Sequence, residues 1–170
     1  MNDKQFQSYK KKIFKFTDYV PHSGQERLHF PDKTARFTVS VCGRRWGKSI
    51  AASKEIEAII TQPNKRAWVV APSYQLAEKV FREVWNELVN KQGIPTRRAS
   101  YRDMYIETEW GSIFEGKSAD NPASLVGEGL DYLVLDEAAK QKSTVWDMYL
   151  RPTLSDRKGK ALFITTPEGY

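Results

Sequence analysis

The segment CGRRWGKS at residues 42–49 decides the fold class of this chain. Its last three residues match the end of the phosphate-binding loop G-x-x-x-x-G-K-[ST], while Cys42 stands where that pattern has its first glycine. Gly43 follows one position later and can supply the tight turn. In such a loop, backbone N–H groups and the N-terminus of the next helix bind phosphate. The ammonium of Lys48 reaches the β- and γ-phosphates, and the Ser49 hydroxyl binds Mg²⁺.

The flanking sequence supports this interpretation, because GKS alone occurs by chance in many chains. The segment RFTVSVC at 36–42 predicts a buried strand that leads into the loop. Residues 47–62 predict a helix, which Pro63 ends. Strand, loop and helix follow one another as a phosphate loop requires, which disfavours an ordinary strand-to-helix turn.

A second strand ends in two adjacent acids. The segment DYLVLDEAA at 131–139 predicts a buried strand with Asp136 at its end and Glu137 directly after it. A carboxylate beside an apolar strand is costly unless it faces a cation or hydrogen-bond donors. Asp136 can therefore hold Mg²⁺ directly or through water, and Glu137 can polarise the water that attacks the γ-phosphate. The alternative is a surface pair that caps the next helix, and Lys48 upstream disfavours it.

The rest of the chain alternates between helix-like and strand-like segments. Two N-terminal helices are expected, an amphipathic one over 3–16 and a short one that starts at the S-x-x-E capping box of Ser23. Further elements are a strand at 66–71, a long helix between Ser73 and Gly93, a hairpin over 104–109 and 112–117, a helical stretch near 143–150, and a strand at 160–167.

Strands separated by helix-length segments predict an α/β fold with a mainly parallel sheet flanked by helices, in a single domain over residues 1–170. Ligands of such sheets bind beyond the carboxyl ends of the strands. Four chemically distinctive segments each follow a predicted strand directly, so we expect them at one edge of the sheet: CGRRWGKS, APS, LDEAA and TTPEG.

Gln25 lies upstream of the loop, in PHSGQERLH. A glutamine amide offers one donor and one acceptor, which match N6 and N7 of adenine. On the residues alone, however, an exposed helix glutamine is the better interpretation of Gln25.

Charge and cysteine content limit the classes of function. The chain has 27 Lys and Arg against 21 Asp and Glu, a net charge of +6, which suits either a polyanionic partner or an ordinary solvated surface. The single Cys42 excludes a disulfide framework within the chain. The polar N-terminus and the lack of long apolar runs argue against a signal peptide or a membrane span. Four lysines of the first helix favour a solvated face over a DNA contact: Lys10, Lys11, Lys12 and Lys15.

Taken together, these segments resemble the ATPase domain of the large terminase subunit of tailed double-stranded DNA bacteriophages. The resemblance covers residues 21–170 and rests on PHSGQERLH, CGRRWGKS, APSYQLAEKVF, SLVGEGLDYLVLDEAA and FITTPEGY. It implies a P-loop NTPase fold of the RecA-like, ASCE type, with the hairpin as an insertion.

The resemblance also implies roles for individual residues. Gln25 would contact adenine, and Glu137 would be the catalytic acid. Arg44 would sense the γ-phosphate, with Arg45 as a substitute; the alternative is that either arginine contacts DNA or a neighbouring subunit. The loop residues expected to bind the nucleotide are Gly43, Arg44, Arg45, Trp46, Gly47, Lys48 and Ser49. Ser49 and Asp136 would hold the metal. The motif expected to couple hydrolysis to movement is Thr165, Thr166 and Pro167.

In that family, hydrolysis of MgATP drives double-stranded DNA into a procapsid. The implied cofactors are ATP and Mg²⁺. The implied partners are double-stranded DNA, the portal protein of the procapsid, the small terminase subunit and further copies of the chain in a ring, with a monomer in isolation and no membrane. The implied location is the cytoplasm of the host cell.

Two departures from the family pattern affect these expectations. Some members carry an arginine shortly before the catalytic glutamate that acts on the ATP of a neighbouring subunit, and SLVGEGLDY has none. Other candidates for that role are Arg97, Arg98, Arg102, Arg151 and Arg157. The chain also stops just past the coupling motif, so we expect no RNase H-like nuclease domain and no nuclease activity in this piece.

Two alternative functions stay open. The first is one lobe of a two-lobed RecA-like helicase, although the acidic motif here is DEAAK, where such helicases usually have DEAD or DEAH. The second is a fragment that binds nucleotide without turnover on its own, because hydrolysis without an arginine finger can be slower by roughly 10³–10⁵-fold.

Overall fold

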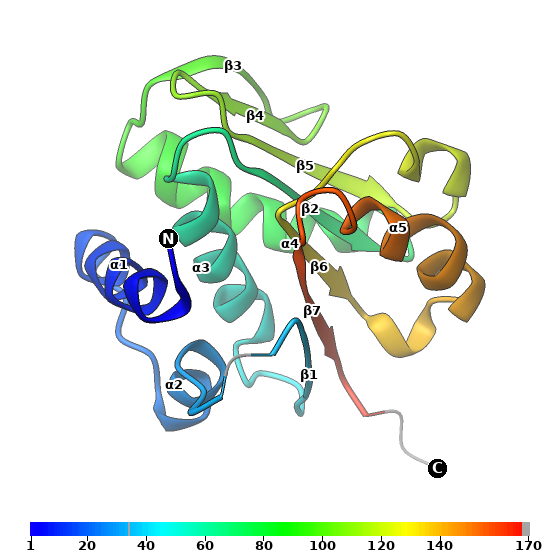
Figure 1. Ribbon diagram of the computed structural model, residues 1–170, viewed down its shortest axis with the longest axis horizontal. Helices are drawn as coiled ribbons and strands as arrows, with labels where there is room; N and C mark the ends of the chain where they lie inside the picture. The colour runs from blue at the N-terminus through cyan, green and yellow to red at the C-terminus, as the bar shows by residue number, and fades with distance from the viewer. Residues whose placement is uncertain (34, 168–170) are drawn as a thin grey trace.

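A seven-stranded sheet forms the centre of the computed structural model, which describes residues 1–33 and 35–167 (Figure 1). The strands are β1 Phe37–Val41, β2 Arg66–Ala71, β3 Thr96–Ser100, β4 Tyr105–Thr108, β5 Ile113–Ser118, β6 Tyr132–Asp136 and β7 Lys160–Thr165. The α-helices are α1 Asp3–Phe16, α2 Ser23–His29, α3 Lys48–Ile60, α4 Tyr74–Val84 and α5 Arg151–Thr153. Shorter helical segments are η1 Trp85–Lys91, η2 Pro122–Leu125, η3 Ala138–Lys140 and η4 Val145–Leu150.

The strand order is β1-β7-β6-β2-β5-β4-β3. The first five strands of this order run parallel, and β4 and β3 are antiparallel to their neighbours. This confirms the predicted, mainly parallel sheet. Because β7 lies between β1 and β6, the end of β7 separates the phosphate loop from the acidic segment.

Helices cover both faces of the sheet. On one face, α3 and α4 pack against the sheet, and α1 and α2 lie outside α3 (Figure 1). The core on this face includes Ile56 of α3, Phe81 of α4 and Phe114 of β5. On the other face, residues of η2, of η4 and of the segment that follows η4 pack against the side chains of β2 and β6 that point to this face. Within residues 1–33 and 35–167, no helix is long and apolar enough to cross a membrane.

One prediction about the sheet is corrected. The strand at 36–42 was expected to be buried, but β1 is an edge strand that pairs only with β7 among the described residues. Phe37, Val39 and Val41 are therefore 37%, 67% and 58% exposed. The predicted hairpin forms β4 and β5 and is joined to the sheet, because β5 pairs with β2 on one side and with β4 on the other. The hairpin and the unpredicted β3 thus extend the same sheet.

The cap of α2 lies one residue earlier than the sequence predicted. The expected capping box was Ser23 with Glu26, whereas the N-cap is His22 and its partner is Gln25. The His22 ring accepts hydrogen bonds from the backbone N–H groups of Gly24 and Gln25, so the imidazole performs the function that was assigned to the Ser23 hydroxyl.

Lys10 is buried, which corrects the expected solvated stripe on α1. Its Nζ lies 2.8 Å from both carboxylate oxygens of Glu55 and donates to the carbonyl oxygen of His29. Nδ1 of His29 lies 2.6 Å from the same Glu55 carboxylate. Burial favours the neutral acid, but the charge of Lys10 and the contact with His29 outweigh it and lower the pKa of Glu55. A buried ion pair therefore joins α1 to α3.

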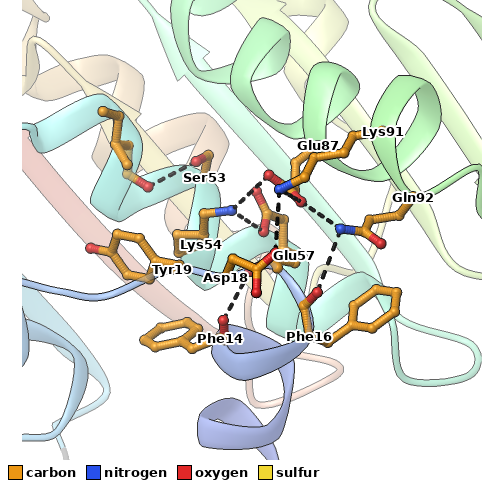
Figure 2. A network of polar contacts seen from close by, with 12 residues as sticks. Phe14, Phe16, Asp18, Tyr19, Ser53, Lys54, Glu57, Glu87, Lys91 and Gln92 are labelled. Atoms are coloured by element: carbon orange, nitrogen blue, oxygen red, sulfur yellow. Dashed lines mark hydrogen bonds and ion pairs between the residues drawn. The ribbon is translucent and has the colours of Figure 1, made fainter.

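A second polar network lies between α3, η1 and the end of α1 (Figure 2). Lys54 Nζ lies 2.8 Å from Glu57 Oε2 and 3.6 Å from Glu87 Oε2, and Lys91 lies 3.2 Å from Glu87. Glu57 is fully buried, and its Oε1 has no hydrogen-bond partner within the described part of the chain. Burial, only partly offset by Lys54, raises the pKa of Glu57 from 4.5 to about 8.

The raised pKa of Glu57 predicts a pH-dependent stability. Between about pH 4.5 and 8 the native state keeps the proton that the unfolded state has lost, so stability falls as pH rises, by on the order of 1 kcal/mol per pH unit. Glu57→Gln removes this titration. The variant should therefore gain in unfolding free energy over the wild type as pH rises from 5 to 8 in urea denaturation. Glu26→Gln, at an exposed position, is the control, and a wild-type-to-Glu57→Gln difference that stays constant with pH would contradict the prediction.

Candidate nucleotide-binding site

The phosphate loop connects β1 to α3 and curls around the side chain of Lys48. Lys48 Nζ donates to the carbonyl oxygens of Cys42 and Gly43, both at 2.9 Å. Two loop residues have left-handed backbones, Arg45 with φ 63° and Gly47 with φ 89°. The ammonium thus lies inside the loop, where the sequence predicted a phosphate-binding cation.

Gln25 contacts the loop directly. Its Nε2 donates to the carbonyl oxygen of Gly47 at 3.3 Å, and its Oε1 accepts from the backbone N–H of His22 at 3.2 Å. The positive φ of residue 47 favours glycine there, and a Cβ would lie 2.7 Å from Gln25 Nε2 and displace that amide. Gln25 is buried, and its amide links α2 to the loop. Its contact with adenine stays a prediction.

Trp46 packs against α2. Its ring meets the His22 ring edge-on at 4.9 Å between centroids, and its carbonyl oxygen lies 3.0 Å from His22 Nε2. Gly24 lies beneath the indole, where a Cβ would come within 3.1 Å of it. This packing anchors one side of the loop, whereas Arg44 and Arg45 on the other side are exposed.

Asp136 is buried at the carboxyl end of β6. Its Oδ1 accepts a hydrogen bond from the backbone N–H of Glu137 at 2.8 Å. Burial is the largest cause that raises the pKa of Asp136, to about 6, and the charge of Glu137 adds to it. The hydrogen bond from Glu137 N–H and the charges of Lys79 and Lys48 lower the pKa and offset part of this rise. A buried carboxylate within the field of Lys48 is the arrangement that the sequence predicted.

Glu137 has an unusual backbone, with φ 49° and ψ 44° in the left-handed region. A side chain with a Cβ is strained there, and such residues concentrate at functional sites. Its Oε2 is buried, lies 3.6 Å from Lys140 Nζ and has no hydrogen-bond partner in the described part of the chain. Nothing in the sequence LDEAA indicated this conformation.

Thr165 connects the loop and the acidic segment. Its carbonyl oxygen accepts from the Cys42 N–H at 3.1 Å, and its hydroxyl accepts from the Ala139 N–H at 3.4 Å. Thr165 is buried, Thr166 is half-buried and Pro167 is exposed. The rest of the TTPEG segment, Glu168 and Gly169, lies outside the described residues.

The residues present fit MgATP. Ser49 lies in the first turn of α3, the helix after β1, and Asp136 ends β6, which is two places from β1 in the sheet. Their hydroxyl and carboxylate are oxygen ligands of the kind that Mg²⁺ prefers. No group of three or more His, Cys, Asp and Glu side chains that could hold a metal occurs in residues 1–33 and 35–167.

The candidate arginines occupy different edges of the sheet. Arg157 donates to Asp131 and to the carbonyl oxygen of Asn64, which precede β6 and β2, so it lies at the edge opposite the loop. Arg97 and Arg98 of β3 lie 3.8 Å from Glu107 and 3.9 Å from Asp103. Two more candidates are exposed, Arg102 in the β3–β4 turn and Arg151 at the start of α5.

A phosphate loop after an edge strand, with paired acids on a strand two places away, defines a P-loop NTPase domain. Comparison with known proteins agrees. Residues 40–170 match the family described as RNA cytidine acetyltransferase NAT10/TcmA, helicase domain. The chain is 36% identical to the terminase large subunit of Thermus phage G20c over 93% of its own length and 36% of that protein.

Solved structures give the same assignment. The Thermus phage P74-26 large terminase ATPase domain superposes with a TM-score of 0.81 at 34% identity, over 94% of this chain and 70% of that one. The large terminase of a thermophilic bacteriophage in complex with ADP has a TM-score of 0.65 at 16% identity, over 95% of this chain and 39% of that one. The chain belongs to the ATPase-domain family of phage large terminase subunits and shares the helicase-type domain matched by residues 40–170. It spans about a third of the length of the curated relative.

Proposed function

We propose that this domain binds MgATP and hydrolyses it to drive double-stranded DNA into a viral procapsid, as part of a large terminase subunit. The observation that supports the proposal is the position of Lys48, Asp136 and Glu137 at one edge of the sheet. Thr165 bonds to both segments that carry them. The large terminase of a thermophilic phage, a protein of the same fold, has been solved in complex with ADP, which supports nucleotide binding by this fold.

In the proposed mechanism, the chain first binds the triphosphate. Lys48 exchanges the carbonyl oxygens of Cys42 and Gly43 for phosphate oxygens, and the N–H groups at the start of α3 add positive potential. Ser49 and Asp136 would hold the magnesium ion. When bound, Mg²⁺ neutralises charge on the phosphates and orients them for in-line attack. Arg44 or Arg45, both exposed, would contact the γ-phosphate.

Glu137 would then orient and polarise the attacking water. Its left-handed backbone places a carboxylate directly beyond the strand end, and its buried Oε2 lies 3.6 Å from Lys140 Nζ, beyond hydrogen-bond distance. A carboxylate beside the phosphoryl group can accept the proton of water as that group is transferred.

Thr165 supplies a path for coupling. A change at the γ-phosphate that moves Glu137 and its turn would shift Ala139, whose N–H bonds to the Thr165 hydroxyl. Thr165 in turn bonds to the loop through Cys42. We extend the coupling proposal to Thr166 and Pro167, which follow directly on the chain.

The proposed setting follows from the family. We propose that residues 1–170 act as a single ATPase domain, in the host-cell cytoplasm. The partners would be double-stranded DNA, a portal protein on the procapsid and a small terminase subunit. Copies of the chain would form a ring, in which an arginine such as Arg102 could reach a neighbouring site.

A helicase function is the second candidate, because residues 40–170 match a helicase domain. The two functions differ in their response to nucleic acid. A packaging motor grips duplex DNA, so duplex DNA should stimulate hydrolysis. A helicase would be stimulated by single strands and would separate a forked duplex.

The proposed function predicts that ATP hydrolysis per chain rises with protein concentration, because neighbouring copies complete each site. We would measure phosphate release from micromolar to submillimolar chain, with and without duplex DNA. Chelation of Mg²⁺ gives the background. A concentration-dependent rate that duplex DNA raises supports the motor, whereas stimulation by single strands alone supports the helicase. A rate at background throughout would mean that this piece binds nucleotide at most.

A further inference from the structure

The turn that follows β6 contains a side chain that the proposed mechanism does not use, Gln141. Its Nε2 donates to the carbonyl oxygen of Asp136 at 3.0 Å and to that of Val70 at 3.2 Å. Asp136 ends β6, and Val70 lies near the end of β2, the next strand of the sheet. One amide therefore ties the carboxyl ends of two neighbouring strands. We propose that Gln141 is a positioning residue for hydrolysis, which holds Glu137 in its left-handed conformation.

The backbone of the turn brings Gln141 back to the strand end. The left-handed Glu137 reverses the chain directly after β6, and η3 follows with the hydrogen bonds Lys140 N–H to Glu137 O at 2.9 Å and Gln141 N–H to Ala138 O at 3.1 Å. The side chain of Gln141 then reaches the carbonyl oxygen of Asp136, the residue before the reversal. The side-chain amide of Gln141 thus closes the turn that contains Glu137, because it bonds to the residue before Glu137.

This closure matters because Glu137 is strained. A residue with a Cβ keeps a left-handed backbone only when its surroundings hold it there. Glycine would adopt the conformation without strain but has no carboxylate. The turn must therefore be restrained by its other residues, and the two hydrogen bonds of Gln141 tie it to both β6 and β2.

Two buried side-chain oxygens at this turn lack a hydrogen bond in the part of the chain that the structure describes. Within the described residues, Gln141 Oε1 and Glu137 Oε2 have no hydrogen-bond partner. Glu137 Oε2 has the Lys140 ammonium nearby, at 3.6 Å, and burial of a polar atom without a hydrogen bond lowers stability, so the turn depends on its other contacts. The expected effect on the rate of hydrolysis rests on the proposed ATPase function. The expected effect on the backbone conformation of Glu137 rests on geometry alone.

Gln141→Met tests the inference, because methionine has a similar length and volume but no donor. Gln62→Met is the matched control, since Gln62 donates one comparable amide bond, to the carbonyl oxygen of Ala58 at 2.9 Å, at the opposite edge of the sheet. We would measure single-turnover hydrolysis with chain in excess over MgATP, together with MgADP affinity. Gln141→Met should slow hydrolysis by about ten- to a hundredfold and change MgADP affinity less than about threefold, because a misplaced base affects the reaction rather than binding.

A crystal structure of Gln141→Met supplies a measurement that does not depend on turnover. We expect Glu137 to leave the left-handed region in the variant and to keep it in Gln62→Met. A left-handed Glu137 in Gln141→Met, or hydrolysis as fast as in Gln62→Met, would overturn the inference. If the wild type does not hydrolyse ATP, the proposed function fails, and the conformation of Glu137 in the crystal still decides the positioning role.

Discussion

Lys48→Ala should weaken the binding of MgATP by roughly 10²-fold, because it removes a charge-assisted contact worth about 1.5–3 kcal/mol with the phosphates. In the structure the Lys48 ammonium donates to two carbonyl oxygens inside the loop. Among the described residues, no other side-chain cation donates to these two oxygens. Isothermal titration calorimetry with MgATP and with MgADP measures the loss. The loss should be larger for MgATP, since Lys48 is expected to reach the γ-phosphate.

Lys12→Ala is the matched control for this prediction. It changes the net charge by the same amount at an exposed position on α1, so it should leave affinity within about twofold of the wild type. Thermal unfolding of Lys48→Ala distinguishes a binding defect from a folding defect. A folded Lys48→Ala variant that binds MgATP as tightly as the wild type would mean that CGRRWGKS is not a phosphate loop.

The loop and the acidic strand end could be predicted because their chemistry requires particular residue types at particular spacings. A phosphate loop needs a lysine at the start of a helix, and acids that end an apolar strand are costly to bury unless they face a cation or donors. The parallel sheet follows from the alternation of strand-like and helix-like segments, which requires crossovers. These predictions depend on local pattern, and the structure places Lys48 and Asp136 at the same edge as expected.

Features set by residues distant in sequence could not be predicted. The run FTVSV has the same pattern in a buried strand and in an edge strand, so the exposure of Val39 and Val41 depends on what pairs with β1. Lys10 is buried because its ammonium pairs with the carboxylate of Glu55, which lies on another helix. The left-handed Glu137 arises from contacts that close its turn, and one of these reaches across to β2.

Glu137→Gln should reduce the rate of ATP hydrolysis by roughly 10²–10⁴-fold, the typical contribution of a general base. Glutamine keeps the length of the side chain and the same left-handed backbone, but it cannot accept the proton of the attacking water. Single-turnover phosphate release measures the effect, and Glu109→Gln, at an exposed position in the β4–β5 turn, is the control.

Nucleotide affinity separates a catalytic role of Glu137 from a structural one. The charge of Glu137 is one of the causes that raise the pKa of Asp136, so its removal favours the ionised Asp136 and does not weaken that metal ligand. MgATP affinity should thus stay within a few-fold of the wild type while the rate falls, since a group that acts only in the transition state changes turnover and not ground-state binding. Equal rates in Glu137→Gln and the wild type would assign the base elsewhere. A parallel loss of affinity and rate would make Glu137 a structural residue of the turn.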